Sequence, residues 1–232
     1  GYRESVSGSQ WPRRQNPHMH LFEALLALYE ASGDPSILSR AKSIKTLFDR
    51  VFHDAGAGVV REFFDPDWSR ATGDLAAVVE PGHLCEWAWL LHEFCRLSGE
   101  PLDPAAARLF ETAMRIGIND NTGLLYAAIN AEGEVLDASS RTWMQTEWLR
   151  AAARMRRLGV SGADAHLQRA VAGMLNYHLR DVVAGGWIDR FDAMGQASSD
   201  RIPASTFYHA FGGIVECLLV SAESAQPAGT GA

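Results

Sequence analysis

Four polar residues recur along the chain at nearly one interval. His20, His83, Glu147 and His209 are 63, 64 and 62 positions apart, and each stands at or near the start of an apolar run with helical periodicity. A repeat of two helices and their connections would bring the same end of every alternate helix to one place. Three imidazoles and a carboxylate would then share one pocket, which favours acid–base catalysis over a purely structural module.

The elements that must position these residues are helices arranged as hairpins. Glycine-containing segments end several of the apolar runs, and Asp103-Pro104 has the form of a helix cap followed by proline in the first turn. The seven predicted helices span 19–32, 36–52, 83–97, 104–118, 141–158, 163–180 and 205–222. The connections contain three extended segments rich in β-branched or aromatic residues, at 58–64, 124–128 and 186–191.

Inner and outer helices differ in polarity. The runs 19–32 and 83–97 are largely apolar, whereas 36–52 and 104–118 carry Arg and Lys on one side. This alternation predicts an all-α toroid with inner helices around an axis and outer helices around them; a simple solenoid is the alternative. We expect one partial barrel domain over residues 1–222, followed by a disordered tail over 223–232 that is small and polar.

Bulk composition excludes several classes of partner. The chain has 232 residues, 47% hydrophobic composition and a formal charge of −7, with no basic stripe, so we expect no nucleic-acid partner and no anionic membrane surface. Three cysteines without CxxC spacing predict buried thiols in a reducing compartment. With no spanning run and no signal-peptide pattern, the expected location is cytoplasmic, and Gly1 in place of an initiator Met suggests a truncation.

His83 and Glu86 form the first candidate constellation. Three residues apart on a helix, they share a face near its start. The positive end of the helix dipole disfavours imidazolium, so this pattern predicts a neutral His83 that could act as a base. Glu86 could orient it or bind a sugar hydroxyl. The alternative is an ordinary helix start whose histidine is satisfied by the backbone.

His18 and His20 have a spacing that invites a metal-site interpretation. Positions two apart on a helix point to different sides, and no HExxH or CxxC pattern accompanies them, so we expect no metal here. Asn16 and His20 are better explained as groups that bind hydroxyls, with a buried core histidine as the alternative.

Trp143 and Glu147 lie on one face at the start of a predicted inner helix, where an indole could pack against a sugar ring. His209 follows Phe207 and Tyr208, two aromatic residues that could shield it from water. The histidines outside the recurrence are expected to be structural: His53, His92, His166 and His178. No phosphate-binding loop or nucleophile motif is present, so the sequence predicts acid–base chemistry without a cofactor.

Four motifs follow one another along the chain. They are Arg14-Gln15-Asn16-Pro17-His18-Met19-His20-Leu21-Phe22-Glu23-Ala24, Glu80-Pro81-Gly82-His83 with Glu86-Trp87, Trp143 with Gln145 and Glu147, and Pro203-Ala204-Ser205 with Tyr208-His209. Together they closely resemble the N-acylglucosamine 2-epimerase family, which includes cellobiose 2-epimerases and mannose isomerases, over about residues 13–220. The resemblance implies an (α/α)6 barrel of six hairpins, of which this chain would hold about three and a half.

The resemblance also implies roles for individual residues. His83 and His209 would be the catalytic acid–base pair that moves the proton at C2 of an open-chain aldose through an enediolate. A proton returned to C1 gives isomerisation, and one returned to the opposite face of C2 gives epimerisation. Glu86 would position His83. The residues expected to bind the sugar are Asn16, His20, Glu86, Trp143 and Glu147, and neither metal nor cofactor is required.

The resulting hypothesis is an aldose–ketose isomerase acting on mannose or a mannose-like sugar, with or without a phosphate. A sugar 2-epimerase of the N-acylglucosamine or cellobiose type is the alternative enzyme. A glycosidase is disfavoured because the recurring positions are mostly histidine rather than carboxylate. The non-enzymatic alternative is a truncated, inactive sugar-binding remnant. An open array of hairpins would expose apolar flanks, from which we expect self-association, for example as a homodimer.

Overall fold

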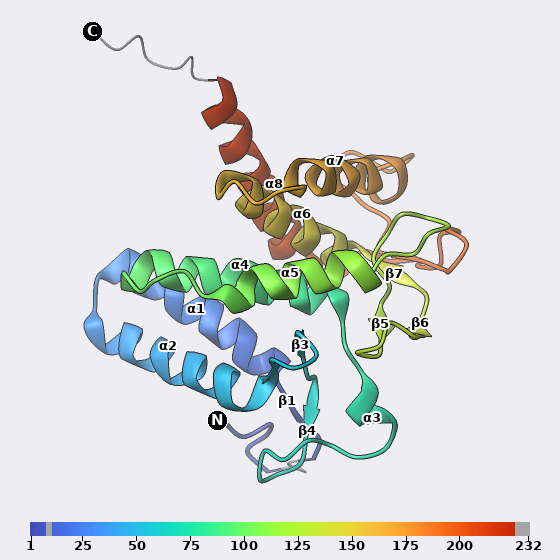
Figure 1. Ribbon diagram of the computed structural model, residues 1–232. Coiled ribbons are helices and arrows are strands. Elements are labelled where there is room, and N and C mark those ends of the chain that lie inside the picture. The colour runs from blue at the N-terminus through green and yellow to red at the C-terminus, as the bar shows by residue number, and fades with distance from the viewer. Residues whose placement is uncertain (8–10, 226–232) are drawn as a thin grey trace, which may run out of the picture. The chain divides into compact units, whose positions relative to one another are not determined.

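The computed structural model describes residues 1–7 and 11–225, and for residues 223–225 it describes the backbone alone (Figure 1). It divides into two compact units, Gly1–Gly117 with Ala128–Asp137, and Ile118–Ala127 with Ala138–Ala232. All seven predicted helices are confirmed. The first unit contains α1 (Asn16–Ser32), α2 (Pro35–Leu47), α4 (Pro81–Ser98) and α5 (Pro104–Ile116), and the second contains α6 (Thr142–Arg157), α7 (Ala163–Gly173) and α8 (Thr206–Ala225).

The helix hairpins are closed by the signals seen in the sequence. Asp34 and Asp103 each accept a hydrogen bond from the backbone N–H two residues later, at the starts of α2 and α5. Gly33 and Gly99 adopt left-handed φ angles of 69° and 72° at the ends of α1 and α4. These stops fold α1 against α2 and α4 against α5.

Three features of the helices differ from the prediction. The outer helices α2 and α7 end in π-helical turns, Phe48–Phe52 and Met174–His178, where the pattern predicted continuous helix. A short helix, α3 (Asp74–Ala77), was not predicted because four residues are too few to show a periodic pattern. The predicted tail over 223–232 stays a prediction from 226 onward, since those residues lie outside the described ones, while 223–225 continue α8.

Each of the three predicted extended segments contributes at least one short strand to an antiparallel pair, and two of the pairs lie at helix starts. In the first unit β1 (Arg13–Arg14) pairs with β4 (Phe63–Phe64), β2 (His53–Asp54) with β3 (Val59–Val60), and β5 (Ala128–Ile129) with β6 (Val135–Asp137); in the second unit β7 (Ser140–Arg141) pairs with β8 (Arg190–Phe191). Because β1 and β7 run directly into α1 and α6, their pairing fixes where those two inner helices begin.

Aromatic packing forms the core of the first unit. The indole of Trp87 lies among Phe22, Phe48 and Phe52, with ring centroids 5.6, 4.4 and 6.4 Å away. Trp87 is fully buried, and so is nearly every residue in the first four turns of α4. The predicted inner position of this helix therefore follows from burial on all of its faces.

The inner helices within each unit run parallel. In the first unit Asn16 at the start of α1 contacts His83 at the start of α4, and Glu30 near the end of α1 accepts from Arg96. In the second unit Glu147 and Arg154 of α6 contact His209 and Glu216 of α8, with the same separation of 62 residues. Within each unit, alternate helices thus bring their N-terminal ends together, as the recurrence predicted.

Gly213 determines how closely α6 and α8 approach. A Cβ atom at this position would lie 2.7 Å from the backbone oxygen of Thr146, whereas one at Gly212 would lie 3.4 Å from the flexible guanidinium of Arg150. Gly213→Ala should therefore lower the free energy of unfolding by about 1–3 kcal/mol, because backbone must move. Gly212→Ala is the matched control and should be neutral or stabilising through helix propensity. Urea denaturation of both variants checks this, and equal effects would contradict it.

His178 is buried at the end of the π-helical turn that follows α7, where its Nδ1 lies 2.8 Å from the carbonyl of Ile188 and 2.9 Å from the hydroxyl of Thr142. Burial lowers the pKa of His178 to about 4. Below about pH 6.5 the unfolded chain binds a proton that the folded one does not, so stability should fall between about pH 6.5 and 4, by about 3 kcal/mol at most. His178→Asn retains the donor without the titration, so in chemical denaturation its stability should change less over that range.

Cys85 and Cys95 are buried thiols, as predicted, and Cys217 is half-buried; the described residues contain no disulfide. None of the described helices has both the length and the hydropathy needed to cross a bilayer.

Candidate active site

His83 lies at the start of α4 in a buried polar cluster of the first unit. Its Nδ1 is 3.0 Å from Oε1 of Glu62 and 3.6 Å from Oε2 of Glu80, and its Nε2 is 3.0 Å from the side-chain amide of Asn16. His83 and Glu62 are 2% and 3% exposed. The imidazole is therefore held from both ring nitrogens, by carboxylates on one side and by an amide on the other.

The electrostatics of His83 contradict the predicted neutral state. Burial by itself favours the neutral imidazole, but the charges of Glu62 and Glu80 and the hydrogen bond to Glu62 outweigh it and raise the pKa of His83 to about 10. The helix dipole acts in the opposite direction, and its contribution is smaller than that of a buried carboxylate in contact. The raised pKa favours the imidazolium form of His83, which suits a proton donor.

His20 and Glu86 form a second pair in the first unit, between α1 and α4. Nδ1 of His20 is 3.3 Å from Oε1 of Glu86. Burial disfavours the charged ring, yet the hydrogen bond and charge of Glu86 raise the pKa of His20. Glu86 was predicted to position His83; instead the carboxylate on Nδ1 of His83 is Glu62, and Glu86 holds His20. The reason is that β1–β4 pairing brings Glu62 beside the start of α4.

His18 points away from His20, as helical geometry predicted. Its Nδ1 lies 3.0 Å from the carbonyl of Arg14, its Nε2 accepts from the backbone N–H of Tyr2, and its ring packs edge-on against Trp68 at 5.1 Å between centroids. Desolvation lowers the pKa of His18. His18 therefore has a structural environment and does not share a face with His20.

His209 and Glu147 form the corresponding pair of the second unit. Nδ1 of His209 donates to Oε1 of Glu147 over 2.7 Å, and Arg150, one turn along α6, lies 3.5 Å from the other carboxylate oxygen. Trp143 and Tyr208 flank the imidazole, with ring centroids 5.7 and 3.9 Å away. Tyr208 shields His209 as predicted.

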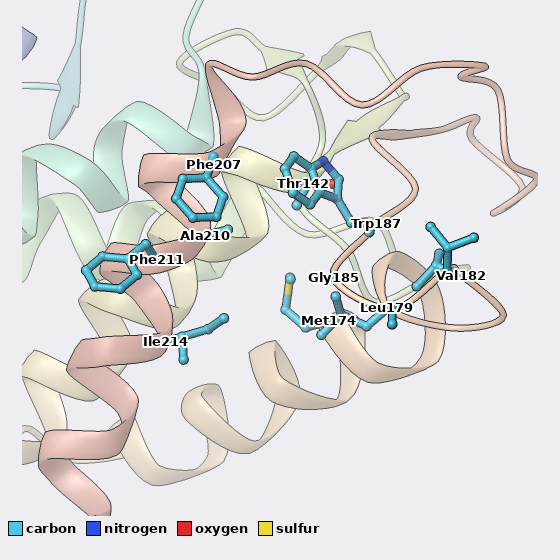
Figure 2. Close-up of a pocket in the computed structure, with 13 residues that line it drawn as sticks. Thr142, Met174, Leu179, Val182, Gly185, Trp187, Phe207, Ala210, Phe211 and Ile214 are labelled. Atoms are coloured by element: carbon cyan, nitrogen blue, oxygen red, sulfur yellow. The ribbon is translucent and has the colours of Figure 1, made fainter.

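Phe207 does not shield His209, because its side chain is 62% exposed. It lines an apolar cavity of about 450 Å³ in the second unit instead, together with Phe211, Trp187 and Met174 (Figure 2). The polar groups in the lining are the hydroxyl of Thr142, which is hydrogen-bonded to the carbonyl of Ile188, and the indole N–H of Trp187. The side chains that line this cavity therefore include no acid or base.

The three histidines of the recurrence share one arrangement. Nδ1 of His20, His83 and His209 each meets a carboxylate, from Glu86, Glu62 and Glu147 respectively. A carboxylate on Nδ1 fixes the ring orientation and holds a hydrogen on that nitrogen, which assigns proton exchange to Nε2. Of the predicted site residues, the structure brings Asn16, His20, His83 and Glu86 together in the first unit, and Trp143, Glu147 and His209 together in the second.

Sequence reasoning missed Glu62, Gln15 and Glu80. Glu62 carried a recognisable signal, because it is an acidic residue within the apolar extended segment Val59-Val60-Arg61-Glu62-Phe63-Phe64 and is nonetheless buried. Gln15 lies in the first motif and is also buried, at the residue before α1. Their partnership arises from strand pairing between distant segments, which local patterns do not reveal.

Two groups in the first unit have ligand atoms close enough to hold a metal ion: His20 with Glu23 and Glu86, and His83 with Glu62 and Glu80. In the second group, Nδ1 of His83 faces the carboxylates and carries a hydrogen. Because the pKa of His83 is raised, this proton competes with a metal ion for the nitrogen. The expectation that no metal is used stays a prediction.

Comparison with known proteins identifies the family. The model for N-acylglucosamine 2-epimerase (GlcNAc 2-epimerase) matches residues 1–213. The chain belongs to this family. It is 39% identical over 212 residues to a mannose-6-phosphate isomerase of Rhizobium meliloti (strain 1021), covering 88% of this chain and 54% of the relative. It is 26% identical to a cellobiose 2-epimerase of Bacteroides fragilis, covering 81% and 48%.

The fold agrees with that of the family. A crystal structure of a D-mannose isomerase superposes with a TM-score of 0.78 at 23% identity, covering 93% of this chain and 58% of that one. Such structures are (α/α)6 barrels, and the described part of this chain holds seven long helices, six of them in three hairpins, so the predicted incomplete barrel is confirmed. The chain spans about half the length of the curated relatives it matches.

Proposed function

We propose that this protein is a sugar isomerase that interconverts an aldose and a ketose of the mannose/fructose type without a metal or other cofactor. The observation that carries the proposal is the carboxylate on Nδ1 of both His83 and His209, which prepares each imidazole for proton transfer at Nε2. Similarity to a mannose-6-phosphate isomerase and to the fold of a D-mannose isomerase supports this reaction class.

The two histidines have complementary roles in this proposal. His83, with a raised pKa, starts as the imidazolium and donates a proton to the carbonyl oxygen at C1. His209 is the base: Nε2 removes the hydrogen from C2, and Glu147 stabilises the imidazolium that forms. The enediol is then protonated at C1 by His209 while the C2 hydroxyl returns its proton to His83, so both histidines are restored.

Sugar binding is assigned to the polar and aromatic side chains beside the two histidines. Asn16 and His20 present an amide and an imidazole at the first pair of helix starts, and Trp143 presents an indole near His209. The remaining two, Glu86 and Glu147, act through the histidines they hold as well as through hydroxyls.

The test is product identity. Mannose, mannose 6-phosphate, N-acetylglucosamine and cellobiose are each incubated with the protein in the longest form that its coding sequence encodes, and the products are separated by chromatography. Fructose or its 6-phosphate is the expected product. Turnover of only the last two sugars, to their C2 epimers, would replace the proposal with the 2-epimerase alternative, which similarity to a cellobiose 2-epimerase favours. Binding without turnover would identify a sugar-binding remnant.

For the partner and the location, we propose self-association and a cytoplasmic site. Apolar side chains of α8 are exposed: Phe207, Phe211, Ile214, Leu218 and Leu219. An apolar stripe of this kind favours association with a second copy, and light scattering at the 25.4 kDa monomer mass would contradict it. The three cysteines without a disulfide in the described chain support a reducing compartment.

A further inference from the structure

A chain of buried hydrogen bonds leads from the aromatic core of the first unit to His83. Nε1 of Trp87 donates to Oε1 of Gln15 over 2.7 Å, Nε2 of Gln15 donates to Oε2 of Glu62 over 2.9 Å, and Oε1 of Glu62 lies 3.0 Å from Nδ1 of His83. We propose that Trp87 and Gln15 are positioning residues that act through Glu62 to hold the hydrogen on Nδ1 of His83, so that Nε2 exchanges protons with the sugar. This inference rests on the proposed function of His83.

The direction of the chain follows from the indole. An indole N–H can only donate, so the Gln15 atom that faces Trp87 must be the oxygen. The other end of the amide is then the NH2 group, which donates to Glu62. The orientation of this buried amide is thereby set by Trp87, and a reversed amide would place its oxygen against the Glu62 carboxylate.

The carboxylate in turn determines the state of the imidazole. An ionised Glu62 only accepts, so the ring nitrogen that faces it must carry a hydrogen. Nε2 of Gln15 is also 3.1 Å from Nδ1 of His83, and two donors this close are compatible only because both are directed at the same carboxylate. With the nitrogen of the Asn16 amide facing Nε2 of His83 over 3.0 Å, the neutral ring carries its hydrogen on Nδ1; when Nε2 also carries a hydrogen, the oxygen of the Asn16 amide must face it.

Backbone and core make the chain rigid. The N–H of Gln15 donates to the carbonyl of Glu62 over 3.1 Å, directly after the register of Arg14 opposite Phe63. Trp87 is fixed by its aromatic neighbours, and Gln15, Glu62 and Trp87 are 0, 3 and 0% exposed. Three side chains that are this buried and fully oriented provide the preorganisation that a catalytic imidazole requires.

Other charged groups also act on His83. Glu80 lies 3.6 Å from Nδ1, Glu86 is on the same helix, and His20 faces from α1. Of the carboxylates near Nδ1, Glu62 is the one that accepts from Gln15 and is thereby connected to Trp87. A test must therefore vary Trp87 and Gln15, whose side chains carry no charge, as well as Glu62.

The experiment is a titration of histidine ring nitrogens by ¹⁵N NMR on this chain, with the signals of His83 assigned by their loss in His83→Gln. Glu62→Gln should increase the acid dissociation constant of His83 about 100-fold. Trp87→Phe retains the ring but removes the donor, and Gln15→Met removes the amide. Each should move hydrogen from Nδ1 toward Nε2 in the neutral ring and shift the titration, and each effect should vanish when combined with Glu62→Gln.

Trp89→Phe is the matched control, since it makes the same replacement on the same helix at a residue that is not part of this series of hydrogen bonds. If Trp87→Phe and Gln15→Met leave the ¹⁵N shifts and titration of His83 as they are in Trp89→Phe, the inference is overturned; Gln15→Met decides alone if Trp87→Phe does not fold. The readout needs no turnover. If these variants alter the ¹⁵N signals of His83 but the protein turns over no sugar, the hydrogen-bond chain is supported and the proposed function is rejected. If the protein turns over sugar but the signals are unaltered, the proposed function is supported and the hydrogen-bond chain is rejected.

Discussion

His83→Gln and His209→Gln should each reduce kcat/KM for aldose–ketose conversion about 10²–10⁴-fold, because each removes one partner of a proton transfer. The two losses should differ in their pH dependence. His83 works as an imidazolium with a raised pKa, so its variant loses the part of the activity that persists at neutral and mildly alkaline pH. His209 works as a base held by Glu147 over 2.7 Å, so its variant loses hydrogen abstraction at every pH.

His166→Gln is the matched control for both variants, since it makes the same replacement on the outer helix α7, outside the recurrence. Steady-state kinetics with mannose, together with circular dichroism to establish folding, measure the effect. Folded His83 and His209 variants that retain the activity of His166→Gln would contradict the assignment of the acid–base pair.

Glu216→Leu should lower the free energy of unfolding by about 3–5 kcal/mol, because it removes the carboxylate from a buried arginine. Arg154 contacts Glu216 through two hydrogen bonds, Nε to Oε1 at 2.8 Å and Nη2 to Oε2 at 3.2 Å, and the two residues are 8% and 5% exposed. The pair joins α6 to α8 two turns beyond His209. Its loss should therefore also weaken the alignment of the two helices that brings His209 within hydrogen-bond distance of Glu147.

The double variant Arg154→Met with Glu216→Leu should recover most of that stability, since apolar side chains replace both charges. Asp164→Asn is the surface control: it weakens an exposed ion pair with Arg156 at 2.7 Å and should cost less than about 1 kcal/mol. Urea denaturation measures all three. A single variant no less stable than the surface control would show that the buried pair does not hold the two helices.

The helices could be predicted because their signals are local. Apolar periodicity and the stops at Gly33 and Gly99 depend on neighbouring residues only, and the starts of all seven long helices lie within a few residues of the predicted ones. The π-helical turns could not be predicted, since they differ from α-helix by one hydrogen-bond register and leave the same apolar pattern. Strands of two residues could not be predicted individually either, because they are too short to show an alternation of apolar and polar residues.

The site was predicted in part, for the same reason. The recurrence identified His20, His83, Glu147 and His209 because equal spacing places them at equivalent helix starts, and the structure pairs two of them, Glu147 with His209. The charge of His83 could not be predicted, because it depends on Glu62, which reaches it only through the pairing of residues 13–14 with 63–64. Local reasoning included the helix dipole and missed the stronger, nonlocal carboxylate.

Isotope exchange tests the central claim most directly. If His209 and His83 exchange protons with a sugar through an enediolate, mannose incubated with the protein in heavy water should yield fructose with deuterium at C1, because the transferred hydrogen exchanges with solvent on the imidazole. NMR of the product shows its position. Fructose formed without any deuterium would point to direct hydride transfer between C2 and C1, and would contradict acid–base catalysis by these two histidines.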